Sequence, residues 1–228
     1  MKQSSLALLT CAALLAAQAV SAQGTAGSFE FTLGPVYAFS KHLDFKEGST
    51  VDLDSNTGGR FGVAFYLTDD FALGADFGYS RANFDATVVG DTSSGQPPTT
   101  VAIENGRTEF STFNFTATYH LLDDWFRPFG LLGLGYNWVH TNISLLPPQT
   151  GCWWDPWYGY ICGTYQPTHN AGSLTYQVGA GVQFNFSDSF GVNLDYRETW
   201  IELQNANKTP GFGSVEALFI FRFGGSEY

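Results

Sequence analysis

Apolar and polar residues alternate from Leu174 to Arg197, along two arms that meet at Ser187, Asp188 and Ser189. Successive side chains of a β-strand point to opposite faces, so this pattern predicts a β-hairpin with one apolar face. The other face carries glycine, asparagine, glutamine, threonine and charge, which do not fill the interior of a soluble barrel or sandwich. Each arm has about ten residues, the length of a tilted strand across a bilayer. The apolar face is therefore expected to meet lipid.

The same alternation recurs along the chain and predicts an all-β fold, a transmembrane up-and-down antiparallel β-barrel of eight strands. Short acidic turns alternate with long polar segments near residues 41–59, 82–106, 139–172 and 202–213. Short periplasmic turns and long outer loops alternate in such barrels, and an even strand number puts both termini in the periplasm. The expected strands are Phe29 to Phe39, Arg60 to Leu67, Phe71 to Ser80, Arg107 to Leu121, Arg127 to Trp138, Leu174 to Phe186, Phe190 to Trp200, and Ser214 to Phe223.

Charged residues within these strands fall on the inward face when the outward face is assigned from apolar residues alone. An Arg or Lys on the lipid face costs roughly 2 to 4 kcal/mol at the bilayer midplane. The interior of an eight-stranded barrel is just wide enough for its own side chains, which favours a polar plug over an ion path. Guessed pairs within the plug are Arg127 with Asp195 and Arg222 with Glu216. The expected lumen charges are Glu30, Arg60, Asp76, Arg127, Asp195, Arg197, Glu216 and Arg222.

The amino terminus is typical of a secretory signal peptide. Lys2 supplies a positive start, residues 6–19 are mostly apolar, and Val20-Ser21-Ala22 forms a small-residue cleavage site. Residues 1–22 are therefore expected to be removed, leaving residues 23–228 as one outer-membrane barrel domain. The net charge of -11 and the lack of a basic stretch argue against nucleic-acid binding.

Two cysteines, Cys152 and Cys162, remain in the mature chain, and an even pair in an exported protein predicts a disulfide. Aromatic residues crowd the loop between them. Held in a small ring, they form either a contact platform for sugars, lipopolysaccharide or a partner protein, or a cluster packed on itself. The residues of this expected surface-binding site are Trp153, Trp154, Trp157, Tyr158 and Tyr160.

Two local features need separate comment. Pro35 falls inside the first strand, where it removes a ladder hydrogen bond, so a bulge or a local break is expected there. The segment from Asp52 to Asn56 has the oxygen spacing that opens a calcium loop. However, Thr57 replaces the turn glycine and Val63 replaces the bidentate acid. A solvated acidic loop without a metal is expected.

Two motifs resemble those of small outer-membrane barrels of the OmpW-like and OmpA-like kind. The strand from Phe126 to Tyr136, FRPFGLLGLGY, is similar to their "RPYxGxGxGY" strand, and the sequence from Phe219 to Phe223, FIFRF, resembles their aromatic terminal strand. The chain departs from the pattern in the extension from Gly224 to Tyr228 and in the cysteine loop. The resemblance implies an eight-stranded barrel and, for the OmpW group, uptake of apolar solutes.

These features predict a monomeric, non-enzymatic barrel in the Gram-negative outer membrane, without a cofactor, whose role is structural or interactive at the cell surface through its outer loops. Its expected partners are outer-membrane lipid, lipopolysaccharide, and a surface ligand or partner protein. A passive channel for small apolar molecules is the alternative. A lipid-modifying enzyme is a more distant one, because none of His42, His120, His140 and His169 stands in a His-x-Ser arrangement.

Overall fold

The computed structural model describes residues 25–45, 48–89, 100–122, 124–144, 149–155, 159–165, 168–202, 206 and 208–224. Within residues 143–171 it describes backbone and no side chains. The expected signal peptide, residues 1–22, lies outside the described residues. Across the described part of the chain, no helix has the length and apolar character needed to cross a membrane.

The described chain is all β. The strands include the alternating segments of the sequence, where β-branched and aromatic residues favour extended backbone, and also parts of the segments expected to be loops. They are β1 (Phe29–Ala38), β2 (Lys41–Asp44), β3 (Thr50–Leu53), β4 (Asn56–Tyr66), β5 (Phe71–Val89), β6 (Thr100–His120), β7 (Phe126–Ser144), β8 (Gln149–Asp155), β9 (Gly159–Tyr165), β10 (Thr168–Asn185), β11 (Phe190–Ile201) and β12 (Gly211–Phe223).

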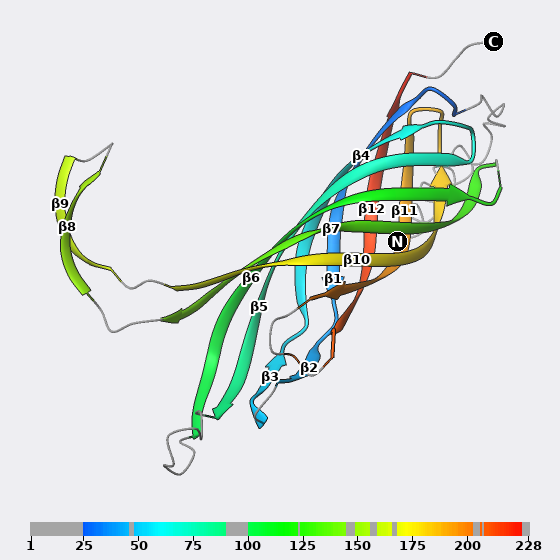
Figure 1. Ribbon diagram of the computed structural model, residues 1–228. Helices are drawn as coiled ribbons and strands as arrows, with labels where there is room; N and C mark the ends of the chain where they lie inside the picture. The colour runs from blue at the N-terminus through cyan, green and yellow to red at the C-terminus, as the bar shows by residue number, and fades with distance from the viewer. Residues whose placement is uncertain are drawn as a thin grey trace, which may run out of the picture.

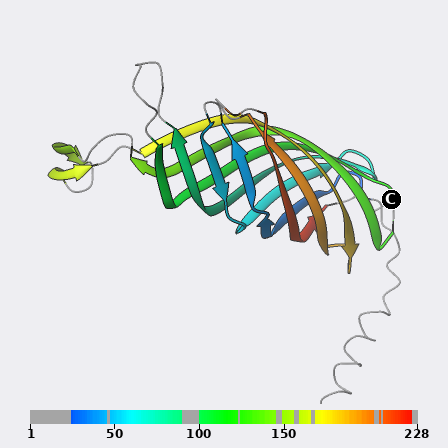
Figure 2. The ribbon, with the colours of Figure 1, turned by 90° about the horizontal axis from the view of Figure 1, so that it is seen from below.

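Eight strands close into a ring (Figure 1). Hydrogen-bonded neighbours follow the order β5, β4, β1, β12, β11, β10, β7 and β6, and β6 pairs again with β5. All of these pairs are antiparallel. Figure 2 shows the tilted strands of the ring from below. The eight-stranded up-and-down fold expected from the sequence is confirmed.

The two ends of the ring differ. Phe29, at the start of β1, pairs with Phe65 of β4 and Phe223 of β12. The chain therefore enters and leaves the ring at the end that also carries the short connections after β4, β6 and β10, called here the turn end. The opposite end, called the loop end, carries the longer excursions.

The outward face of the ring is apolar. Phe115 of β6 pairs with Leu134 of β7, and Leu132 lies two positions before Leu134 on the same strand. The exposed fractions of Phe115, Leu132 and Leu134 are 66%, 64% and 69%. Asn114, which precedes Phe115 on β6, points inward and is fully buried. Soluble monomers rarely expose a contiguous apolar patch larger than a few hundred Å². Such a wall around the whole ring indicates contact with lipid.

Several segments that the sequence predicts to be loops are partly strands. β5 and β6 stay paired well beyond the ring, out to Val89 and Thr100. The β2–β3 hairpin joins this extension, since β3 pairs with residues 84–87 of β5. β8 and β9 form a separate two-stranded sheet that stands apart from the ring (Figure 1). Polar residues on solvent-facing positions of these strands interrupt the apolar alternation, which hides the pairing from sequence inspection.

Pro35 produces the expected local break without a bulge. Between β1 and β12 the pairing stops after Leu33 with Phe219 and resumes at Val36 with Glu216, in unchanged register. Pairing with β4 continues through Pro35. A Cβ on Gly34 would lie 2.1 Å from the Ala217 carbonyl oxygen, so only glycine fits this close approach.

Candidate functional site

A dense ion cluster fills the middle of the ring. Arg197, on β11, is bound by three carboxylates: its Nη1 lies 3.0 Å from Asp76, and its Nε lies 2.8 Å from Asp195 and 3.4 Å from Glu216. Arg60 of β4 joins the same acids, with Nη1 on Asp76 and Nε donating to Glu216 at 3.0 Å. All five side chains are buried. This group, the central ion cluster, crosses the lumen from β4 to β11.

Uncharged side chains extend the central ion cluster. Asn114 donates to Asp76 at 3.0 Å and accepts from Thr175 at 3.1 Å. Gln177 donates to the other Asp76 oxygen at 3.4 Å. A buried ion pair repays its desolvation only when its remaining lone pairs and protons are also bonded, and these amides supply part of that bonding.

A second group lies nearer the turn end. Glu30 accepts hydrogen bonds from Arg222 and from the Tyr66 hydroxyl, each at 3.0 Å. The Arg222 guanidinium lies 5.4 Å from the Tyr66 ring centroid, and the His120 ring stacks on Tyr66 at 5.7 Å. Arg127, fully buried, donates to the Leu122 carbonyl at 3.1 Å and to the Asp69 carbonyl. These contacts close the lumen a second time.

The eight charges named from the sequence are therefore all buried and lie inside the ring. The guessed pairing was wrong. Parity, meaning the odd or even position of a residue along its strand, fixes the face of a side chain but not its height along the barrel. Arg222 binds Glu30 rather than Glu216, and Asp195 is bound by Arg197 rather than by Arg127.

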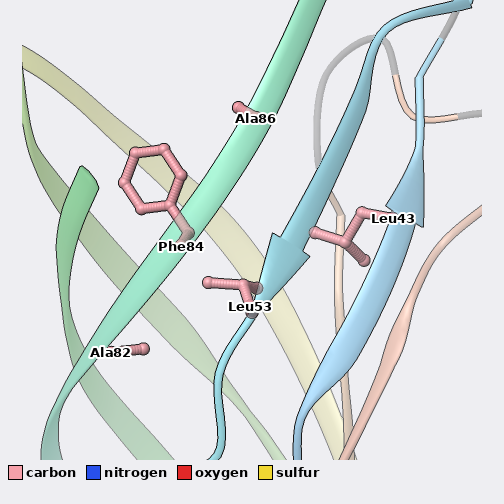
Figure 3. Close-up of a cluster of buried hydrophobic side chains, with 5 residues drawn as sticks. All are labelled: Leu43, Leu53, Ala82, Phe84 and Ala86. Atoms are coloured by element: carbon pink, nitrogen blue, oxygen red, sulfur yellow. The ribbon is translucent and has the colours of Figure 1, made fainter. Parts of the chain in front are cut away.

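Above the central ion cluster, toward the loop end, the interior becomes apolar. Leu43 of β2 and Leu53 of β3 pack on Ala82, Phe84 and Ala86 of β5, and all five residues are buried (Figure 3). Sequence reasoning missed this cluster because the segments were assigned to loops. The signal was present, since Ala82, Phe84 and Ala86 continue the inward parity of Asp76 along β5.

A cavity of about 100 Å³, called here the loop-end chamber, lies between the apolar cluster and the central ion cluster. Leu53, Ala82, Phe110 and Phe212 line it on the apolar side, and Arg60 lines it on the charged side. The Phe110 and Phe212 ring centroids are 6.3 Å apart. The chamber is thus a mainly apolar pocket whose lining includes two charged residues, Arg60 and Asp54.

The acidic segment that opens like a calcium loop is divided between β3 and β4, with Leu53 buried in the apolar cluster. Asp52 instead lies 2.5 Å from the His42 Nδ1 atom across the β2–β3 hairpin. The Asp52 carboxylate, and after it Asp44, raises the pKa of His42 above its usual value. Among the described residues, no group of three potential metal ligands is found.

The cysteine loop contains β8 and β9. Their register puts Cys152 directly opposite Cys162. Trp153 and Trp154 lie on β8 and Tyr160 on β9, while Trp157 and Tyr158 lie outside the described residues; no side chain of this segment is described.

A closed ring of strands with an apolar wall and a charged, hydrogen-bonded interior defines a transmembrane β-barrel, since closure leaves no backbone group unpaired toward lipid. The chain belongs to the outer membrane protein beta-barrel domain family, whose model matches residues 5–223. It is accordingly a protein of the outer membrane.

Solved structures agree with this fold. The chain is similar to Neisserial surface protein A, with 14% identity and a TM-score of 0.55 over 86% of this chain and 99% of that one. It is also similar to the outer membrane protein OprG from Pseudomonas aeruginosa, with 12% identity and a TM-score of 0.50 over 89% and 98%. At these identities the likeness concerns the fold alone. No curated protein matches the sequence at a significant level.

Proposed function

We propose that this protein is a non-enzymatic outer-membrane barrel that binds small apolar molecules in its loop-end chamber. The observation that carries the proposal is an apolar cavity of about 100 Å³ directly above the central ion cluster. A dry apolar cavity of about 150 Å³ is known to bind benzene, so a chamber of this size suits a molecule of about one ring. Ligand sites are commonly apolar pockets with few polar groups.

The central ion cluster argues against passage through the whole barrel. Arg60, Asp76 and Arg197 bridge the lumen below the chamber, and moving an apolar solute past them requires separating buried ion pairs. The chamber is therefore proposed as a site of capture from the loop end, rather than as part of a channel to the turn end.

Ligand binding is tested with 4-fluorotoluene and protein refolded into lipid nanodiscs, using fluorine NMR with empty nanodiscs as reference. Saturable binding is expected. Ser80 lines the chamber from β5, so Ser80→Leu should fill the space and weaken binding about tenfold or more. Thr57→Leu is the matched control, because Thr57 faces outward on the neighbouring strand. Absence of saturable binding to the unmodified protein would refute the proposal.

A second candidate is contact with a surface ligand, lipopolysaccharide or partner protein through the β8–β9 hairpin. The separate two-stranded sheet with opposed cysteines supports it, because a cross-linked hairpin presents its aromatic residues at low ordering cost. Trp154→Ala together with Trp157→Ala is expected to reduce binding to lipopolysaccharide or cells, measured against Leu132→Ala on the barrel wall. Unchanged binding would remove this candidate.

A further inference from the structure

The charged side of the loop-end chamber carries a hydrogen-bond donor that the protein does not use. Arg60 is buried, with its Nε on Glu216 and its Nη1 on Asp76. Its third nitrogen, Nη2, makes no hydrogen bond with any described residue. Nη2 also keeps some solvent-accessible surface, since it is absent from the fully buried polar atoms that lack a partner. Because Arg60 lines the chamber, Nη2 is left to donate into that space.

The neighbouring strand β5 leaves the Arg60 Nη2 donor accessible. Gly78 of β5 pairs with Arg60 of β4, and a Cβ built on Gly78 would lie 3.7 Å from Nη2. A larger side chain there would cover the guanidinium. Two hydroxyls of the chamber are already engaged, since Thr112 donates to Asn137 at 2.7 Å and Ser214 donates to Glu216 at 3.4 Å. The Asn56 Oδ1 atom, on another lining residue, is buried without a partner among the described residues, but an amide oxygen can only accept a hydrogen bond and does not compete with Nη2 as a donor.

Charge decides which acceptor this donor prefers. The central ion cluster holds three carboxylates, Asp76, Asp195 and Glu216, against the two guanidinium groups of Arg60 and Arg197. An anionic ligand on Nη2 would add a fourth negative charge in a confined space of low polarity, which is costly. A neutral oxygen accepts the same hydrogen bond without that repulsion.

We infer that the chamber selects small apolar molecules that carry one neutral hydrogen-bond acceptor, a hydroxyl or carbonyl oxygen, and that Arg60 Nη2 is the group that selects them. The apolar body of the ligand lies against Phe110, Phe212 and Leu53, and its oxygen points toward Arg60. This inference rests on the proposed function and names its ligand class.

The test compares three probes of nearly equal size in the nanodisc assay: 4-fluorophenol, 4-fluorotoluene and 4-fluorobenzoate. A hydrogen bond to a charged donor is expected to make 4-fluorophenol bind about tenfold more tightly than 4-fluorotoluene. The benzoate, being anionic, is expected to bind most weakly. Equal binding of the phenol and the toluene would overturn the inference and leave the proposed function standing, whereas no binding of either probe would overturn both.

A substitution assigns the selectivity to its residue. Arg60→Lys keeps a cation beside Asp76 and Glu216, but lysine has a single terminal nitrogen and so has no equivalent of Nη2. The tenfold preference for 4-fluorophenol is expected to disappear while 4-fluorotoluene still binds. Arg81→Lys, on the exposed outer side of β5, is the matched control and should keep the preference. If Arg60→Lys fails to fold, judged by gel migration with and without heating, the probe comparison on the unmodified protein still decides.

Discussion

Arg197 shows how a buried charge is accommodated at the scale of one residue. Three carboxylates surround it, so its guanidinium exchanges water for charged acceptors. Among the described residues, the eight buried Asp, Glu and Arg side chains of the lumen balance, with four acids and four arginines; they are Glu30, Asp76, Asp195, Glu216, Arg60, Arg127, Arg197 and Arg222. Such a balanced interior is tolerable only while every member remains, since removing one leaves its partners charged and unpaired.

Arg197→Ala is therefore expected to destabilise the folded barrel by about 3 to 5 kcal/mol, because it leaves the buried Asp195 without its arginine and leaves Asp76 and Glu216 with Arg60 alone. The measurement is urea unfolding of protein refolded into vesicles, followed by tryptophan fluorescence. Arg81→Ala is the control, since the Arg81 side chain is 60% exposed and its ion pair with Glu109 is open to water. Equal midpoints for the two variants would contradict the account of the ion cluster.

The identity of each lumen charge could be predicted from parity, and its partner could not. Alternation assigns Glu30 and Arg222 to the inward face, but their contact depends on the register between β1 and β12, which links residues far apart in sequence. Tyr66 escaped notice for a different reason. It lies at a strand end beside an expected turn, and an uncharged inward residue there carries no distinctive pattern.

At the scale of elements, the strands inside the membrane were predictable and those beyond it were not. Lipid forces strict alternation on β10, β11 and β12, whereas water accepts any polar residue on the outer parts of β5 and β6. A bulge in β6 shows why alternation does not predict the inward face reliably in this outer part. Asn105 adopts a positive φ of 55°, and the pairing shifts by one between Phe84 with Gly106 and Ala86 with Ile103.

The β8–β9 hairpin is expected to carry a disulfide between Cys152 and Cys162. Directly opposed residues of an antiparallel pair have Cα atoms about 4.5 to 5.5 Å apart, within the range that a disulfide spans. Closing so short a ring removes unfolded-state entropy worth roughly 3 kcal/mol in the chain-entropy model. Intact mass spectrometry of protein purified without reductant should show the loss of two hydrogens.

Moving one cysteine by a single position provides the control for this pair. In the variant with Cys162→Ser and Gly163→Cys, the two cysteines are no longer directly opposed, since Gly163 pairs with Gly151. Two free thiols are expected in the monomer. Free thiols in the unmodified protein would instead show that no disulfide links Cys152 and Cys162, and the second candidate function would lose the support of a cross-linked hairpin.

At the scale of the whole molecule, two closures in series leave the lumen without an open path among the described residues: the central ion cluster, and the contacts of Glu30, Tyr66 and Arg222 near the turn end. Refolded protein in a planar bilayer is therefore expected to give little or no steady single-channel current. A large, stable conductance would show that the buried pairs open readily.

The orientation of the barrel is a separate prediction: the loop end faces outside and the turn end faces the periplasm. Long excursions are tolerated where the chain is free in solvent. Single cysteines at Ser94 and Asp188, in a background of Cys152→Ser and Cys162→Ser, are labelled on intact cells with an impermeant maleimide. Labelling at position 94 and not at 188 is expected, and the reverse pattern would invert the barrel.

The break at Pro35 also has a consequence for the order in which the barrel assembles. β1 and β12 are the first and last strands of the described part of the chain, so the seam between them cannot form until residues 29 and 223 meet. Contacts between such distant residues form late and slowly, because the chain between them must already be arranged. At Gly34 and Pro35 that same seam lacks part of its ladder. Assembly of the barrel should therefore end where its wall has the fewest backbone bonds, and unfolding should begin there.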